Sequence, residues 1–317
     1  MFEFIASTEF LRSTLLFATP IMFAALAALV SNKAGILNIN VEGGMAVSAL
    51  VGGLVSHFTA SWLWGVLAAV VTGVLMALVF AFFALRWKTP SILTGIALNT
   101  MASGLCVYLL YVIIGVKGDS SLRPSAMIPN LALPLLKDIP VLGPVLFDQN
   151  LLVYLVLVLG IALTILYQRT RLGLHLRAVG HHPVASTSVG LPVQKLQIIA
   201  LIMGGILTGL GGAYLSMVYL SYFSVGMVAG RGFIGLAAEA MGRGIPGWTM
   251  LFALLFGAVD YFAVGAQTVL GFPYELLNTL PYWMTLFALI IFAFKQHILP
   301  SRRRRKLKGD QSHESTL

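Results

Sequence analysis

The sequence predicts an all-α, polytopic membrane protein with about nine transmembrane helices, within a range of about eight to ten. Of the 317 residues, 58% are hydrophobic and 10% are charged, whereas about 25% are charged in an average soluble domain. The mean hydropathy is +0.92, and apolar runs long enough to cross a bilayer recur along most of the chain. These observations exclude a soluble domain that carries a single membrane anchor.

Residues 1–300 are interpreted as a single transmembrane domain, because apolar runs of about 20 residues follow one another along them. We predict nine crossings, at roughly 12–30, 35–57, 62–85, 91–115, 150–168, 196–221, 226–242, 246–264 and 279–298. The second and seventh contain Gly and charged residues, and they are the candidates for broken or re-entrant segments.

The charge distribution supports alternation of these crossings from an N-terminus outside the membrane. In that topology fifteen of the twenty Lys and Arg residues fall on the inside, in agreement with the positive-inside rule. The central loop 169–195 and the basic, polar tail 301–317 are then cytoplasmic. They carry much of the net charge of +9, which therefore indicates membrane topology and not nucleic-acid binding. Loss or gain of one crossing would reverse the side of the N-terminus.

The loop 169–195 contains Arg and His residues but no acidic residue. Its part from Arg171 to Ala185 is compatible with a short helix that ends or kinks near Pro183. Such a basic helix either lies on anionic lipid or docks onto a cytoplasmic partner. On the other side of the membrane, the external loop 116–149 contains five prolines, which favour a compact cap or a plain connector over long helices.

Two octapeptides share the pattern G-x-[IL]-x-[IL]-x-x-E, at Gly35–Glu42 and Gly232–Glu239. In the predicted topology they run in opposite directions across the membrane. This arrangement is typical of inverted repeats whose broken helices flank a transport pathway. The sequence therefore predicts an inverted repeat with broken helices.

Three acidic residues, Glu42, Glu239 and Asp260, fall within predicted crossings. A carboxylate costs roughly 2.5 kcal/mol or more there, so each one should face a protein interior, a cavity or an interface. For the two glutamates we expect hydrogen bonds to the exposed amides of a broken helix. Asp260 is either coupled to proton movement or paired with a basic residue such as Arg243.

Amide side chains also occur within the predicted crossings or, for Gln267, just after one, and with the three carboxylates they are the candidates for a translocation pathway or for broken helices. The amides are Asn38, Asn40, Asn99 and Gln267. Ordinary helix packing is the alternative for each of them. The glycines between Gly204 and Gly212 are interpreted as sites of close helix packing.

Motifs for enzymatic chemistry are absent from the sequence. No G-x-x-x-x-G-K-[ST] motif is present, so the chain does not hydrolyse nucleotides by the P-loop route. The adjacent His181 and His182 have no Cys or carboxylate nearby in the sequence, and no metal site is expected. We predict no catalytic residues.

Three segments resemble the permeases of bacterial ABC importers for branched-chain amino acids, simple sugars and nucleosides. They are NINVEGGMAVSALVGG, GLHLRAVGHHPVASTSVGLPVQKLQIIALIMGGILTGLGGAYLS and AGRGFIGLAAEAMGRGIPGWTMLFALLFG. The resemblance implies a multi-pass permease subunit of the bacterial inner membrane, which is not itself an enzyme. It also implies that the loop 169–195 contains a coupling helix that contacts a separate ATPase. The residues implied in that contact are Arg177, Ala178, Gly180, His181 and Ala185.

The same resemblance implies no cofactor in this chain, since ATP and Mg²⁺ would bind to the partner subunit. The implied partners are a cytoplasmic ABC ATPase, a second homologous permease and an extracytoplasmic solute-binding protein, besides the lipid bilayer. Three further segments are most similar to the nucleoside-type permeases: KAGILNINVEGGM, DIPVLGPVLFDQNLLVY and LPYWMTLFALIIF.

No basic residue falls in the predicted middle of a crossing, which favours a neutral polar solute such as a nucleoside. Two alternatives remain open at this point. One is the same machinery with a simple sugar or a branched-chain amino acid as its solute. The other is a proton-coupled secondary transporter that uses Glu42, Glu239 or Asp260.

Overall fold

The computed structural model describes residues 8–132 and 148–270, together with Thr279, Trp283, Leu286, Phe287 and Ile290. Its secondary structure is almost entirely helical. The helices are α2 (Thr8–Lys33), α3 (Val41–Thr59), α4 (Trp62–Ala81), α5 (Ser91–Ile114), α7 (Leu151–Arg169), α8 (Arg171–His181), α9 (Pro183–Ser188), α10 (Val193–Tyr214), α11 (Arg231–Gly242) and α12 (Pro246–Leu270). Two π-helical turns, η1 (Phe82–Arg86) and η3 (Leu215–Tyr219), extend α4 and α10. Two short antiparallel strands, β1 (Asn130–Ala132) and β2 (Asp148–Asn150), pair with each other.

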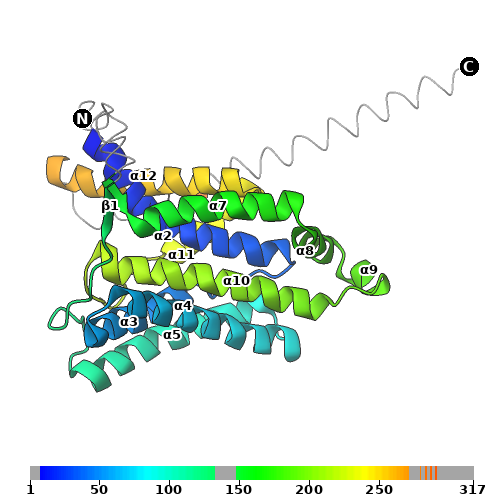
Figure 1. Cartoon of the computed structure of the whole chain (residues 1–317), viewed down its shortest axis with the longest axis horizontal. Coiled ribbons are helices and arrows are strands. Elements are labelled where there is room, and N and C mark those ends of the chain that lie inside the picture. Colours follow the sequence, from blue (N-terminus) through cyan, green and yellow to red (C-terminus); the bar gives the residue numbers. More distant parts are fainter. Residues whose placement is uncertain are drawn as a thin grey trace, which may run out of the picture.

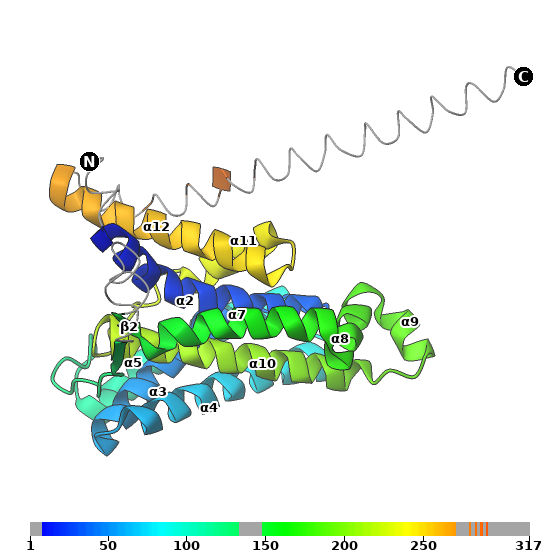
Figure 2. The same cartoon turned by 45° about the horizontal axis from the view of Figure 1, so that its top comes forward.

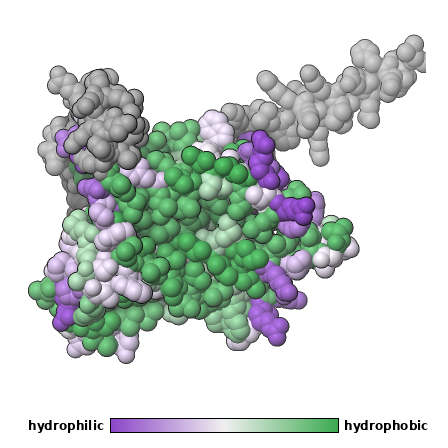
Figure 3. All heavy atoms as spheres, viewed as in Figure 1, coloured by the Kyte–Doolittle hydropathy of each residue, from purple (hydrophilic) through white to green (hydrophobic). Residues whose placement is uncertain are grey.

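The long helices run side by side between two polar ends (Figure 1). Helices α8 and α9 lie at one end, and the strand pair lies at the other. Apolar residues cover the middle of the visible face, with hydrophilic residues gathered towards the two ends (Figure 3). Within the described residues, seven helices are long and apolar enough to cross a membrane. The structure is therefore that of an all-α, polytopic membrane protein, as the sequence predicts.

The predicted crossing at 226–242 is wrong as a continuous transmembrane helix. Residues 220–230 are not helical, and α11 has 12 residues. At 1.5 Å per residue such a helix is about 18 Å long, whereas the hydrocarbon core is about 30 Å thick. The crossing at 35–57 is also broken, because helix α3 begins only at Val41. The predicted crossing at 279–298 lies almost wholly outside the described residues.

The contacts between helices follow an inverted repeat. Helix α2 leads to the α8 end, the non-helical segment 34–40 turns back, α3 continues in that direction, and α4 returns. Helix α10, the non-helical segment 220–230, α11 and α12 repeat this path in the opposite sense (Figure 2). Accordingly α4 packs on α10 as α12 packs on α2, and α3 packs on α10 as α11 packs on α2. The helices that follow the two non-helical segments, α3 and α11, contact each other. Both are called half-helices below, although α3 is long enough to cross a membrane and α11 is not.

The inverted repeat was predicted from the match between the octapeptides Gly35–Glu42 and Gly232–Glu239. That match does not align structurally equivalent positions. Residues 35–40 are not helical, whereas 232–239 lie wholly within α11. The equivalent positions are Glu42 and Gly232, each the second residue of its half-helix. The prediction of inverted, broken helices thus agrees with the element order, although the alignment of the two segments was wrong.

Glycines on α10 allow three neighbouring helices to approach its backbone closely. A Cβ at Gly209 would lie 2.6 Å from the carbonyl oxygen of Ala69 on α4. A Cβ at Gly212 would lie 2.6 Å from the carbonyl oxygen of Met45 on α3. Helix α10 is therefore packed closely in the centre of the bundle, which agrees with the interpretation of these glycines as packing sites.

The described part of the external loop lies against the segment that leads from η3 to α11. The Ser120 N–H donates to the Phe223 carbonyl at 2.7 Å, and the Ser125 N–H donates to the Ser221 carbonyl at 2.8 Å. In the same loop Ser121 donates from its N–H and its hydroxyl to Asp119, and these bonds lower the pKa of that carboxyl group. Residues 133–147 of the loop lie outside the described residues.

Candidate functional site

Helices α8 and α9 form the end of the molecule that the charge distribution of the sequence predicts to be cytoplasmic. The Thr170 hydroxyl accepts a hydrogen bond from the Gly173 N–H at 3.2 Å and so caps the start of α8. Helix α8 ends at His181, and α9 begins at Pro183, which occupies a position at the start of a helix where its missing N–H is tolerated. The predicted helix that kinks near Pro183 is confirmed.

One face of α8 packs against the membrane domain, and its buried residues are Gly173, Leu176 and Val179. Gly180 is half-buried, and a Cβ there would overlap the carbonyl oxygen of Lys33 at the end of α2. The remaining residues implied in ATPase contact are placed differently. Ala178, His181 and Ala185 are exposed, whereas Arg177 is half-buried. Gly180 thus packs closely against the end of α2.

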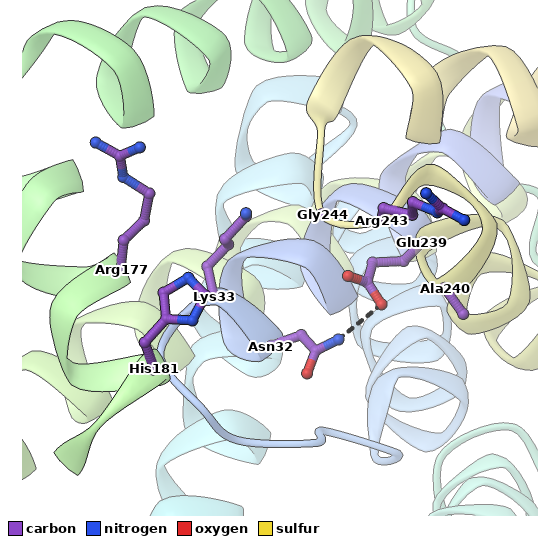
Figure 4. Close-up of a pocket in the computed structure, with 9 residues that line it drawn as sticks. Asn32, Lys33, Arg177, His181, Glu239, Ala240, Arg243 and Gly244 are labelled. Carbon is purple, nitrogen blue, oxygen red and sulfur yellow. Dashed lines mark hydrogen bonds between the residues drawn. The ribbon is translucent and has the colours of Figure 1, made fainter. Parts of the chain in front are cut away.

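Behind α8 lies a pocket of about 220 Å³ that joins three parts of the chain (Figure 4). Its lining comes from the end of α2, from α8 and from the end of α11 with the following turn. The lining residues are Asn32, Lys33, Arg177, Gly180, His181, Glu239, Ala240, Arg243 and Gly244. The structure therefore brings Arg177 and Glu239, predicted separately from two distant segments, into one cavity.

The charges in this cytoplasmic pocket are unbalanced. Its lining contains the basic side chains of Lys33, Arg177 and Arg243 and a single carboxylate, from Glu239. Glu239 is only 4% exposed, and it accepts a hydrogen bond from the Asn32 side-chain amide at 2.9 Å. The Nε atom of Arg177 is buried without a hydrogen-bond partner. The expectation that Glu239 holds the amides of a broken helix was wrong, because its bond is to a side chain.

The expectation for Glu42 is confirmed. Its Oε1 accepts from the Gly230 N–H at 2.8 Å, and its Oε2 accepts from the Gly232 N–H at 2.8 Å. These amides belong to the start of α11, where the first N–H groups of a helix have no partner within the helix. A carboxylate at this position also opposes the positive end of the helix dipole. Glu42 therefore joins the N-terminal ends of the two half-helices.

The amides of Asn38, Asn40 and Asn99 hold the other broken segment. The Asn99 Oδ1 accepts from the Gly43 N–H at 2.8 Å, and its Nδ2 donates to the Ile39 carbonyl at 3.0 Å. The Asn38 Oδ1 accepts from the Asn40 N–H at 3.1 Å. The Asn40 Nδ2 donates to the Met76 carbonyl of α4 at 3.3 Å, while its Oδ1 is buried without a partner. These residues stabilise the non-helical backbone that a bilayer interior would otherwise disfavour.

Asp260 pairs with a basic residue, as one of the two predictions expected, but the partner is Arg231 and not Arg243. An Arg231 Nη atom lies 3.1 Å from the Asp260 Oδ2, and the two side chains are 8% and 15% exposed. The same guanidinium donates to the Met227 carbonyl at 3.1 Å and lies 5.0 Å from the ring centroid of Tyr219. A basic residue is therefore buried within the helix bundle, which the sequence prediction did not foresee, but a carboxylate neutralises it. Gln267 lies on α12, and its side chain is outside the described part of the structure.

Arg231, Asn32 and Lys33 were not predicted as site residues. In the sequence Arg231 and Lys33 lie near the ends of apolar runs, where they are indistinguishable from ordinary topology signals. The one available signal was the sequence Gly230-Arg231-Gly232, in which glycines flank a cation next to an apolar run. It allows close approach of another chain segment, as the contact with Glu42 shows.

Residues 10–294 match the family described as branched-chain amino acid transport system / permease component. The chain belongs to this permease family. The match covers α2 from residue 10 onwards and every described helix from α3 to α12. The protein is accordingly a multi-pass membrane permease.

Several relatives of this permease match over most of their length. It is 32% identical over 292 residues to the nucleoside ABC transporter permease protein NupC of Lactococcus lactis, with 89% of this chain and 91% of the relative covered. It is 32% identical over 295 residues to the guanosine ABC transporter permease protein NupQ of Bacillus subtilis, with 88% and 90% covered. It is 30% identical over 264 residues to the putative glucose ABC transporter permease protein TsgC13 of Haloferax volcanii, with 82% and 78% covered.

Proposed function

We propose that this permease carries a nucleoside through the membrane as part of an ABC importer. The observation that carries the proposal is the 32% identity, over almost nine-tenths of the chain, to permeases named for nucleoside and guanosine transport. A permease named for glucose matches at 30%, so a simple sugar is the second candidate solute.

The paired charges inside the bundle support a neutral solute. Arg231 is neutralised by Asp260, and both oxygens of Glu42 accept hydrogen bonds from backbone amides. Among the described residues, the cation at the bundle centre therefore already has a counterion and is not available to bind an anionic solute. Transfer of an unpaired charged solute through such a site costs several kcal/mol, which a nucleoside or a sugar avoids.

A separate ATPase supplies the energy in this proposal. The sequence has no P-loop, so ATP and Mg²⁺ bind to the partner, and this chain needs no cofactor of its own. The exposed side chains of Ala178, His181 and Ala185 form the outer surface of α8 and α9, where that subunit docks. Movement of the docked helices then reaches α2 through the contact of Gly180 with Lys33.

Two further partners complete the proposed importer. A second permease of the same family pairs with this chain, since each of two organisms has two relatives named as permeases for one solute class. A solute-binding protein delivers the nucleoside at the end of the molecule that carries the external loop.

The test of the solute is competition for uptake of a radiolabelled nucleoside by cells that express the complete transporter. Excess unlabelled nucleoside should abolish uptake, while a nucleotide, ribose or leucine should not. Competition by leucine without competition by nucleoside would refute the proposal. Competition by ribose alone would assign the permease to the sugar branch.

The energy source is tested separately in vesicles that contain the full complex. Uptake should require ATP on the ATPase side and should survive collapse of the proton gradient. The Arg231–Asp260 ion pair supports this expectation, because Asp260 already has a cationic partner. Uptake by this chain alone, driven by a pH step, would instead identify a secondary transporter.

A further inference from the structure

The cytoplasmic pocket contains more positive charge than its own carboxylate can neutralise. Lys33 and Arg177 both line it, and the only carboxylate in its lining is that of Glu239. The loop 169–195, which supplies Arg177, contains no acidic residue that could enter the pocket. By contrast, the buried cation of the bundle, Arg231, has a carboxylate at 3.1 Å. The excess charge in the pocket is therefore a local feature and not a general property of this fold.

The arrangement of the side chains leaves two cations facing the same open space. Figure 4 shows Arg177 on one side of the pocket, Glu239 on the other, and Lys33 between them. The Glu239 carboxylate is turned towards the Asn32 amide and is hydrogen-bonded to it. Arg177 lies near enough to repel Lys33 electrostatically, while Glu239 attracts it. Among the described residues, no carboxylate forms an ion pair with either of them.

The donor groups suit an oxyanion. A guanidinium and an ammonium group donate strong, charge-assisted hydrogen bonds to phosphate oxygens. A cavity of about 220 Å³ also holds considerably more than one water molecule. A doubly charged, compact anion would therefore offset the repulsion between the two cations.

We propose that the cytoplasmic pocket binds a phosphate-class oxyanion between Lys33 and Arg177, and that its occupation slows transport. The bound anion would join α8 to the end of α2, because the two cations belong to these two helices. It would thus resist the movement of α8 that the ATPase imposes. The inhibitory part rests on the proposed function, since that function assigns the ATPase contact to α8. The binding part rests on the pocket alone.

The chemistry allows two sources for the anion. One is inorganic phosphate, and the other is the phosphate group of a nucleoside monophosphate. Phosphoryl transfer to a hydroxyl of the imported nucleoside is the class of reaction that produces the latter on the cytoplasmic side. In that case the pocket would sense the product into which the imported solute is converted.

Binding is measured by calorimetry on the full-length chain in nanodiscs of zwitterionic lipid, at constant chloride ionic strength. Inorganic phosphate, a nucleoside 5′-monophosphate and the unphosphorylated nucleoside are titrated in turn. Lys33→Gln should weaken binding of the phosphorylated ligands about tenfold, the usual effect of losing one charged donor. Glu239→Gln should strengthen it, because the carboxylate that repels the anion is removed. The matched control is Arg171→Gln, since Arg171 is an exposed arginine on α8 that does not line the pocket.

Opposite effects of Lys33→Gln and Glu239→Gln, with no effect of Arg171→Gln, would establish the site. Equal binding by all four proteins, or no binding at all, would overturn it. Tighter binding of the monophosphate than of inorganic phosphate would identify the nucleotide as the source. The reverse order would identify free phosphate.

Inhibition is measured as ATP hydrolysis by the complete importer in nanodiscs, stimulated by the loaded binding protein. The monophosphate should reduce the stimulated rate for the wild type and for Arg171→Gln, but about tenfold more should be needed for Lys33→Gln. Product inhibition at the ATPase itself would be equal in all three proteins, so this comparison distinguishes it from inhibition through the pocket. Equal inhibition would refute the regulatory role. Failure of any nucleoside to stimulate hydrolysis would refute the proposed solute, while the calorimetry would still decide the site.

Discussion

The two charged regions of this permease differ in how their charges are compensated. At the centre of the bundle, Glu42 accepts from two backbone amides, and Arg231 pairs with Asp260. At the cytoplasmic end, Lys33 and Arg177 have no such partners among the described residues, and the nearby Glu239 is bonded to an amide. The centre therefore has the features of a fixed scaffold that holds two half-helices together. The cytoplasmic pocket has the features of a region whose contacts change when a partner or ligand binds.

This difference predicts that substitutions at the centre lower stability, while substitutions in the pocket alter activity with little loss of stability. The largest loss is expected for Asp260→Asn, which leaves Arg231 buried without a counterion. Removal of one partner from a buried ion pair costs about 3–5 kcal/mol, and the partial exposure of Asp260 places this case near the lower limit. The measurement is unfolding of the chain in detergent. The double variant Arg231→Met with Asp260→Leu should recover most of the loss, and failure to recover it would contradict a simple pairing role.

A smaller loss is expected for Glu42→Gln. The amide oxygen of Gln can accept from only one of Gly230 and Gly232, and its NH₂ group faces a donor. One buried N–H left without a partner costs about 1–3 kcal/mol. The matched control is Glu9→Gln, since Glu9 is exposed in the first turn of α2 and should change stability little. Equal effects of the two substitutions would show that Glu42 does not stabilise the contact between α3 and α11.

The boundary between the two regions is tested by Gly180→Ala. A Cβ at Gly180 would overlap the Lys33 carbonyl oxygen and push α8 away from α2. Overpacking typically costs about 1–3 kcal/mol, and an end helix that can shift should lie near the lower limit. Gly104→Ala on α5 is the control, because a Cβ there meets no atom within 4 Å. The distinguishing result is a fall in uptake for Gly180→Ala that exceeds its loss of stability.

The sequence predicted the bundle better than its charged sites, for physical reasons. Apolar length and the charge bias of loops are local properties, so the long helices and the kink at Pro183 were predicted correctly. The break before Val41 and the short helix α11 depend on distant partners, since Glu42 and Asn99 supply bonds that a continuous helix would not need. Partner choice is likewise non-local. Asp260 is closer in sequence to Arg243 than to Arg231, yet the fold pairs it with Arg231.

The smallest loss of stability is expected for Arg177→Glu, which should nevertheless have the largest effect on coupling. Arg177 is half-buried on α8 and has no ion pair among the described residues, so reversal of its charge breaks no ion pair and should change the free energy of unfolding by about 1 kcal/mol or less. A carboxylate at this position would instead attract Lys33 and tie α8 to α2. Uptake and stimulation of the partner ATPase should therefore be lost, while insertion and unfolding remain close to the wild type. Arg171→Glu makes the same charge reversal outside the pocket and should retain both activities. Normal uptake by Arg177→Glu, or equal loss in the two variants, would show that the unbalanced charge of the pocket has no part in coupling.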